Sequence, residues 1–160
     1  MSFPGPESSA PTAVRVSFVL VAASVVATVV SLVLTFAHAD ELARVVGDAT
    51  GAGFDEGLRS SAVFHGICCS ALMLLGVQAT RGRNWARVLL TALAVFTVLA
   101  GFVSGDARYP AMIIFAVMVA QVLQVGTVIA LWLPTSNEFF QRVGTARAVP
   151  SMDAYVLRLR

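Results

Sequence analysis

The sequence predicts an all-α integral membrane protein: a four-helix antiparallel bundle with both termini cytoplasmic and a short interfacial helix after the last span. Three observations predict this fold class. First, 58% of the 160 residues are hydrophobic and only 12% are charged, which is about half the charged share of an average soluble domain. Second, the apolar residues gather in four long stretches without charge. Third, the arginines cluster in segments that would share one side of the membrane.

The same composition excludes several other classes of protein. A nucleic-acid-binding protein needs a basic face, whereas this chain has a net charge of +2, with eleven arginines, no lysine and nine acids. A disordered chain would contain far less apolar surface. Cys68 and Cys69 are adjacent within an apolar stretch, and this spacing fits neither a zinc site nor a disulfide scaffold.

Four stretches are long and apolar enough to cross a bilayer as helices. A hydrocarbon core of about 30 Å requires roughly 20 residues of helix, and a charged residue at the centre of a span would cost about 2.5–3.5 kcal/mol. The uncharged stretches are residues 16–36, 60–80, 88–105 and 109–133. Because the loops between the last three stretches are short, these spans are expected to be sequential antiparallel neighbours.

The distribution of arginine predicts the orientation of the spans. Arg81, Arg83 and Arg87 lie between the second and third spans, and the C-terminal segment carries four more arginines. The first loop, residues 37–59, holds five acids against two arginines. By the positive-inside rule, the arginine-rich loop and tail are cytoplasmic. Both termini are therefore expected in the cytoplasm, and the acidic loop is expected outside.

The segments outside the spans are assigned from composition and length. Residues 1–14 are rich in proline and serine and are expected to be disordered, residues 15–147 form the transmembrane domain, and residues 148–160 form a cytoplasmic tail. The first loop is expected to start with a short interfacial turn at residues 40–46 and to continue as an irregular, glycine-containing stretch.

The end of the first span resembles a signal-peptidase site. Ala37 and Ala39 flank His38 in a small-x-small pattern. However, the preceding apolar stretch of 21 residues is longer than the about 7–15 residues of a signal peptide. The first span is therefore expected to be retained. Cleavage after Ala39 would instead leave three spans and an N-terminus outside.

The residues after the last span predict a short helix. Pro134 is followed by Thr135 and Glu138, which have the spacing of a capping box. Aromatic and aliphatic side chains then follow on one side. This pattern predicts an amphipathic helix over residues 136–146 that lies in the cytoplasmic interface.

The hydroxyl side chains of the first span fall on one stripe of its helix. They recur at spacings of 7, 4, 3 and 4 residues, as Ser17, Ser24, Thr28, Ser31 and Thr35. At about 100° per residue these positions share a narrow arc. Such a stripe is typical of a helix–helix seam, where small side chains allow close approach. The alternative is the polar wall of a solute path.

Three further polar side chains inside the spans are candidates for function. His65 lies on the second span, and Gln121 and Gln124 lie on the fourth. The imidazole could be structural, take part in proton transfer or substrate binding, or ligate haem with His38 as a second ligand. The glutamines are expected to make interhelical hydrogen bonds, with a ligand contact as the alternative. The candidate polar face inside the membrane comprises Ser24, Thr28, Ser31, His65, Gln121 and Gln124.

The sequence contains no pattern that indicates catalysis, a cofactor or a metal ion. The interiors of the spans hold no Asp, Glu, Lys or Arg, so the carboxylate that couples proton- or cation-driven export is missing. No CxxC, Gly-x-Ser-x-Gly, HExxH or phosphate-binding loop is present. Gly101 and Gly105 form a GxxxG pattern, which is common in helix packing or dimerisation. We therefore predict no catalytic, cofactor-binding or metal site.

Two motifs resemble those of a known group of proteins. The first is GRNWAR at residues 82–87, before the third span, and the second is LWLPTSNEFF at residues 131–140, after the fourth. They resemble the GR-x-WAR and LWLP-x-SN-x-[YF]-F signatures of small four-span membrane proteins of high-GC Gram-positive bacteria. The likeness covers about residues 80–142. It implies this topology and a bacterial cytoplasmic membrane, and it implies no chemistry because the family has no settled activity.

The sequence therefore favours a non-enzymatic accessory or scaffold subunit. It would be embedded in the lipid bilayer and associate with copies of itself or with a larger membrane protein. The alternative is a small-solute channel or facilitator that acts as an oligomer, with a path lined by the first-span stripe, His65 and Gln121. A cavity between the spans at these residues would favour the channel, and dry, close packing would favour the scaffold.

Overall fold

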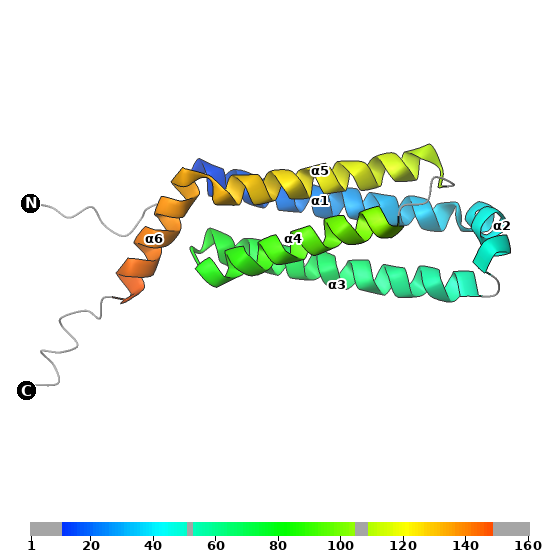
Figure 1. Ribbon diagram of the computed structural model, residues 1–160, viewed down its shortest axis with the longest axis horizontal. Helices are drawn as coiled ribbons and strands as arrows, with labels where there is room; N and C mark the ends of the chain where they lie inside the picture. Colours follow the sequence, from blue (N-terminus) through cyan, green and yellow to red (C-terminus); the bar gives the residue numbers. More distant parts are fainter. Residues whose placement is uncertain (1–10, 51–52, 105–108, 149–160) are drawn as a thin grey trace, which may run out of the picture.

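Every element that the structure describes is a helix. The computed structural model describes residues 11–50, 53–104 and 109–148 (Figure 1). The four long helices are α1 (Thr12–Ala37), α3 (Phe54–Thr80), α4 (Asn84–Ser104) and α5 (Ala111–Trp132). The two shorter helices are α2 (Ala39–Thr50) and α6 (Pro134–Ala148). Residues 1–10 of the expected disordered segment, Gly105 and the tail after residue 148 lie outside the described residues.

The four long helices are all apolar enough to cross a membrane. The prediction of an all-α chain with four such helices is confirmed. Three of them begin earlier than the uncharged stretches, because α1 starts at Thr12, α3 at Phe54 and α4 at Asn84. A polar or charged side chain in the first turn can still reach the membrane surface, so a helix need not start where its apolar stretch starts. The second loop therefore shrinks to residues 81–83, and Arg87 belongs to α4.

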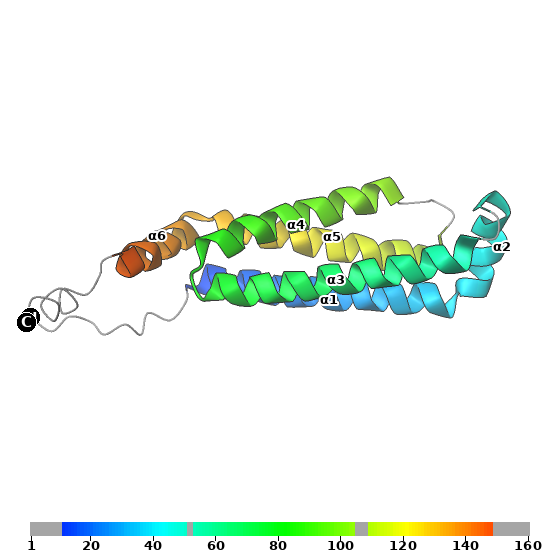
Figure 2. The same cartoon turned by 90° about the horizontal axis from the view of Figure 1, so that it is seen from below.

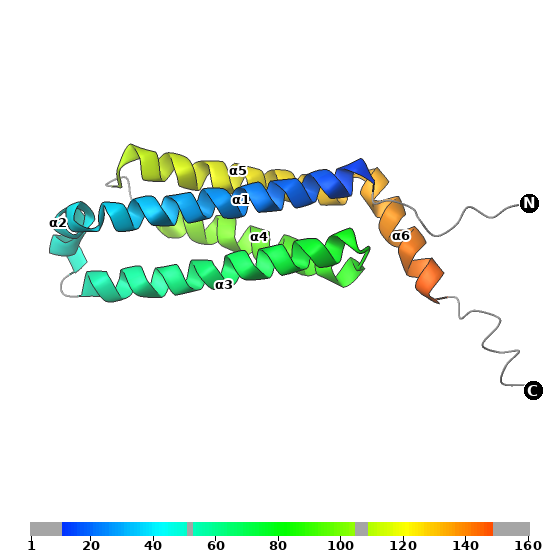
Figure 3. The ribbon, with the colours of Figure 1, turned by 180° about the vertical axis from the view of Figure 1, so that it is seen from behind.

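The long helices lie side by side along one axis, and each runs opposite to the one before it (Figures 1 and 3). Around the bundle, α1 contacts α3, α3 contacts α4, α4 contacts α5, and α5 contacts α1. Figure 2 shows α3 beside α1 and α4 beside α5. The interface between α1 and α5 is the most extensive of the four. The first and last long helices therefore form the central pair.

Small side chains form both sides of this central pair. The buried residues of α1 are spaced three, four and seven residues apart, at Val14, Ser17, Val21, Ser24 and Ser31. The buried face of α5 includes Ala116, Ala120, Thr127 and Ala130. A Cβ placed at Gly126 of α5 would lie 3.5 Å from Cδ1 of Leu20. Small side chains at these positions allow the two backbones to approach closely.

Among the described residues, the largest cluster of buried apolar side chains in mutual contact draws on α1, α3, α4, α5 and α6. It comprises Val14, Val21, Leu72, Ala79, Leu90, Leu131 and Phe140. Phe140 comes from α6, so this helix is anchored in the core at its end of the bundle. Large apolar side chains elsewhere on the long helices remain exposed, as at Leu74 (68%) and Phe115 (71%). A membrane would cover these side chains with lipid.

The first loop contains more helix than expected. Residues 40–46 were expected to form a short turn before an irregular stretch, but α2 continues to Thr50. Asp40 and Glu41 occupy its first turn, where negative charge stabilises a helix. Leu42 is only 1% exposed, and α2 contacts both α1 and α3. These contributions outweigh the low helix propensity of Gly47.

The helix after the last span begins at Pro134, two residues earlier than predicted. The carbonyl of Leu133 accepts hydrogen bonds from two backbone N–H groups of the first turn, both at 3.0 Å, so Leu133 is the residue that precedes the helix. The prediction that Thr135 caps the helix is therefore wrong, because Thr135 lies within it. Proline suits the first helical position because no N–H is needed there. The carbonyl of Ala130 cannot accept from Pro134, which has no N–H. The hydroxyl of Ser136 donates to that carbonyl instead, at 2.9 Å, and fixes α6 to α5.

Gly82 connects the turn between α3 and α4 to α6. Its φ is +72°, a conformation that glycine adopts without strain. A Cβ at this position would also lie 2.8 Å from Cγ1 of Val143 on α6. Glycine is therefore required for both the turn and the contact, and the arginine-rich turn is held at the end of the bundle that carries α6.

Candidate functional site

Most hydroxyl groups of the α1 stripe form hydrogen bonds with the backbone of α1 itself. Four hydroxyls donate to a carbonyl three or four residues earlier in α1, at 2.8–2.9 Å, and they belong to Ser17, Ser24, Thr28 and Thr35. Ser17, Ser24 and Ser31 are at least 92% buried, with exposed fractions of 3%, 1% and 8%. The hydrogens of these four hydroxyls are thus bonded to backbone carbonyls and do not point to a solute path.

The two glutamines of α5 face α4 and are almost buried, at 8% for Gln121 and 7% for Gln124. The hydroxyl of Thr97 on α4 donates to Oε1 of Gln124 at 2.7 Å. This is a direct hydrogen bond between two long helices, as the sequence predicts for this pair. The amide nitrogen of Gln121 lies so close to Gly101 that a Cβ there would overlap it. Gly101 thus makes room for the glutamine.

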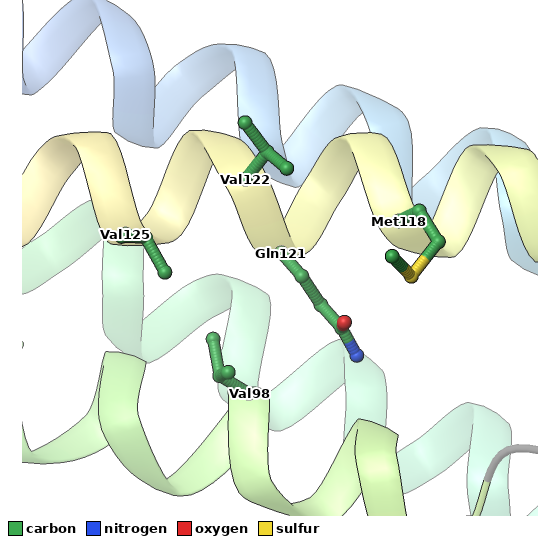
Figure 4. Close-up of a pocket in the computed structure, with 5 residues that line it drawn as sticks. All are labelled: Val98, Met118, Gln121, Val122 and Val125. Atoms are coloured by element: carbon green, nitrogen blue, oxygen red, sulfur yellow. The ribbon is translucent and has the colours of Figure 1, made fainter.

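A small cavity lies beside Gln121 (Figure 4). Its volume is about 190 Å³, and its other lining residues are Val98, Met118, Val122 and Val125. The Gln121 side chain extends from α5 towards α4 (Figure 4). Its Oε1 is buried and has no hydrogen-bond partner among the described residues. The cavity is apolar apart from this amide, so it offers a single polar group and no polar path.

His65 on α3 is partly buried and turned to its own helix. Its Nδ1–H donates to the carbonyl of Ser61 at 2.8 Å. The ring also makes an edge contact with Phe64, with centroids 5.6 Å apart. His38 similarly uses Nδ1 on the carbonyl of Leu34, at 2.9 Å. Within the described ranges, no group of three His, Cys, Asp or Glu is placed to hold a metal ion.

The six candidate residues do not line one common surface. Ser24, Thr28 and Ser31 lie on the buried stripe of α1, the glutamines meet α4, and His65 bonds within α3. The α1 hydroxyl residues lie together on their stripe, and Gln121 and Gln124 lie together at their shared contact with α4, but these two groups and His65 are not joined. The candidate polar face thus divides into separate packing contacts.

The structure adds a cluster that the sequence analysis missed. Arg87 was placed in a basic loop, but it lies in the first turn of α4 and is only 4% exposed. Its Cζ is 3.8 Å from the ring centroid of Trp132 and 5.2 Å from that of Phe140. The indole N–H of Trp132 donates to Oγ1 of Thr91 at 3.0 Å. The sequence does contain a signal for this cluster. Arg87 and Thr91 are four residues apart and therefore share one face of α4, and Trp132 ends α5 at the same end of the bundle.

The guanidinium of Arg87 is buried without an anion. Its Nε and Nη2 have no hydrogen-bond partner in the part of the chain that the structure describes. Glu138 is paired with Arg142 at 3.3 Å. Each cation–π contact returns about 0.5–2 kcal/mol, whereas burial of an unpaired charge costs several kcal/mol. The cation–π contacts therefore offset only part of the cost of burying this charge.

Compared with known proteins, the chain matches no family model, no curated protein and no solved structure. The geometry of its own residues is therefore the basis for the function proposed below.

The hydrogen bond between Thr97 and Gln124 should be measurable as a coupling energy. Thr97→Val and Gln124→Met should each lower stability, and the double variant should lose less than the sum. The expected difference is about 0.6–1.7 kcal/mol, the range for hydrogen bonds between membrane helices. Reversible unfolding of the four proteins in mild detergent gives the cycle.

A matched cycle provides the control for this prediction. Thr80 donates to the carbonyl of Val77 in its own helix, at 2.8 Å. Thr80→Val combined with Gln124→Met should be additive to about 0.5 kcal/mol. Additive behaviour of the Thr97 and Gln124 pair would contradict an energetic role for their bond.

Proposed function

We propose that the protein is a non-enzymatic accessory or scaffold subunit of a bacterial cytoplasmic membrane. The observation that supports this proposal is the bonding and burial of the hydroxyl side chains on the α1 stripe. Four of its five hydroxyls donate to their own helix, and its serines are buried in the bundle. Polar residues that could line a path are thereby consumed by packing between the first and last spans. Such a bundle is suited to be a rigid membrane anchor for partners.

The rival function is a small-solute channel or facilitator formed by an oligomer. It would need the α1 stripe, His65 and Gln121 around one polar path. Within the described residues these side chains point to different neighbours, and the cavity at Gln121 holds about 190 Å³ with an otherwise apolar lining. These observations favour the scaffold over the channel.

Specific association in the membrane tests the scaffold proposal. A photo-crosslinking amino acid is placed at the exposed positions Val26 (62%), Ile67 (65%) and Leu99 (59%), on three different helices. A scaffold should give a discrete adduct, with a second copy or one larger membrane protein, from one face and not from all three. The buried position Leu90 (1%) serves as the control and should give no intermolecular adduct.

Release of small solutes from reconstituted vesicles tests the rival channel function. The scaffold proposal predicts that release of small polar solutes matches that of protein-free vesicles. Protein-dependent release that Gln121→Leu abolishes would establish the channel instead. The absence of any discrete adduct from all three faces would also contradict the scaffold.

We infer that both termini are cytoplasmic and that α1 is retained. The arginine-rich turn and α6 lie at one end of the bundle, with the acidic α2 at the other (Figure 1), which matches the positive-inside rule. Cleavage after Ala39 would remove α1, and with it the most extensive interface of the bundle.

Cysteine labelling tests this orientation in intact cells. With Cys68 and Cys69 replaced by alanine, a membrane-impermeant maleimide should label Glu41→Cys from outside, because this position on α2 is exposed. It should label Thr145→Cys, which is exposed on α6, only after the cells are opened. The reverse pattern would contradict the proposed orientation, and loss of residues 1–39 from the intact mass would contradict retention of α1.

A further inference from the structure

A second and larger cavity lies where α4 begins, α5 ends and α6 packs across them. Its volume is about 640 Å³, and Arg87, Trp132 and Phe140 form part of its lining. The polar part of the lining consists of Asn84, Asn137, Gln141 and Thr145. The cavity therefore combines one guanidinium with several uncharged polar side chains.

Arg87 gives this cavity its chemistry. The side chain is 96% buried, because its exposed fraction is 4%. Two of its three guanidinium nitrogens, Nε and Nη2, lack partners among the described residues and have almost no accessible surface, so neighbouring side chains have to move before a phosphate oxygen can reach them. The planar guanidinium offers parallel N–H groups that match the oxygens of a phosphate. The rings of Trp132 and Phe140 hold it in place from α5 and α6. We propose that this cavity binds the phosphate group of an anionic phospholipid.

The position of the cavity favours a lipid as the source of the phosphate. Trp85 and Trp132, each 50% exposed, mark the level at which aromatic side chains meet lipid headgroups. Val88 lines the cavity and is also 50% exposed, so the lining continues into the apolar surface of α4. The phosphate can therefore meet Arg87 while the acyl chains follow that surface.

The lining also favours an anionic lipid over a zwitterionic one. A choline or ethanolamine headgroup carries a cation beside its phosphate, and this cation needs a carboxylate or an aromatic face. Among the described residues, no carboxylate lines the cavity. The face of Trp132 is already occupied by Arg87, and Glu138 is paired with Arg142. A glycerol headgroup instead matches the amides and the hydroxyl of the lining.

Lipid binding to the purified full-length chain tests the proposal. Native mass spectrometry compares dioleoyl phosphatidylglycerol with dioleoyl phosphatidylcholine for the first lipid bound. We expect phosphatidylglycerol to bind roughly tenfold more tightly, because both lipids present a phosphate to Arg87 but only phosphatidylcholine adds a cation that the lining does not pair and the guanidinium repels. The same preference should be lost in Arg87→Gln and kept in Arg142→Gln, which removes an exposed arginine.

A second pair of variants avoids any effect of Arg87 on folding. Gly144 lines the cavity, and nothing lies within 4 Å of a Cβ placed there. Gly144→Glu therefore fits the fold and introduces a carboxylate that repels a phosphate, whereas Gly144→Gln has the same size without the charge. The glutamate variant should lose the preference for phosphatidylglycerol, and the glutamine variant should keep it.

Each outcome decides the proposal, which does not depend on the scaffold function. Equal binding of the two lipids by the unaltered protein, or an unchanged preference in Gly144→Glu, would overturn it. Displacement of phosphatidylglycerol by excess inorganic phosphate would show that the site takes free phosphate, and it would overturn the assignment to a lipid. Retention of phosphatidylglycerol under excess phosphate supports the lipid.

Discussion

The rest of the structure depends on close packing between α1 and α5. Lipid chains are as apolar as leucine, so burial of apolar surface does not drive spans together, and helices associate through close packing and hydrogen bonds. The serines of α1 and the alanines of α5 permit such packing. Because this contact joins the first and last spans, it closes the bundle, and α3 and α4 complete it by contacts along its side.

Polar groups inside the bundle follow from the same constraint. An unsatisfied polar group is costly in lipid, so four of the five α1 hydroxyls bond to their own backbone, and Gln124 bonds to Thr97 across the helices. Pro134 leaves one carbonyl without a donor, and Ser136 supplies it. Arg87 is the main departure, because its charge is buried with aromatic rings and no anion among the described residues. A departure of this kind is where a ligand gains most from binding.

The sequence predicted the spans well because length and apolarity alone decide them. It also identified the α1 stripe, since hydroxyls at a three–four spacing must share one face, and it anticipated the interhelical bond of Gln124. It could not place Arg87 or α2. The boundary between the second loop and α4 depends on whether a polar first turn is helical, and α2 depends on the burial of one leucine, Leu42, on other helices. The helix start at Pro134 was missed because Ser136 replaces the missing N–H only through tertiary geometry.

Disulfide formation between α1 and α5 in isolated membranes tests the central pair most directly. With Cys68 and Cys69 replaced by alanine, cysteines are placed at Leu20 and Gly126, where a Cβ at position 126 would lie 3.5 Å from Cδ1 of Leu20. The packing predicts rapid disulfide formation within one chain for this pair. It predicts much slower formation for Leu20→Cys with Val125→Cys, since Val125 lines the cavity beside Val98 of α4. No disulfide for the first pair, or equal formation in both, would contradict the pairing of α1 with α5.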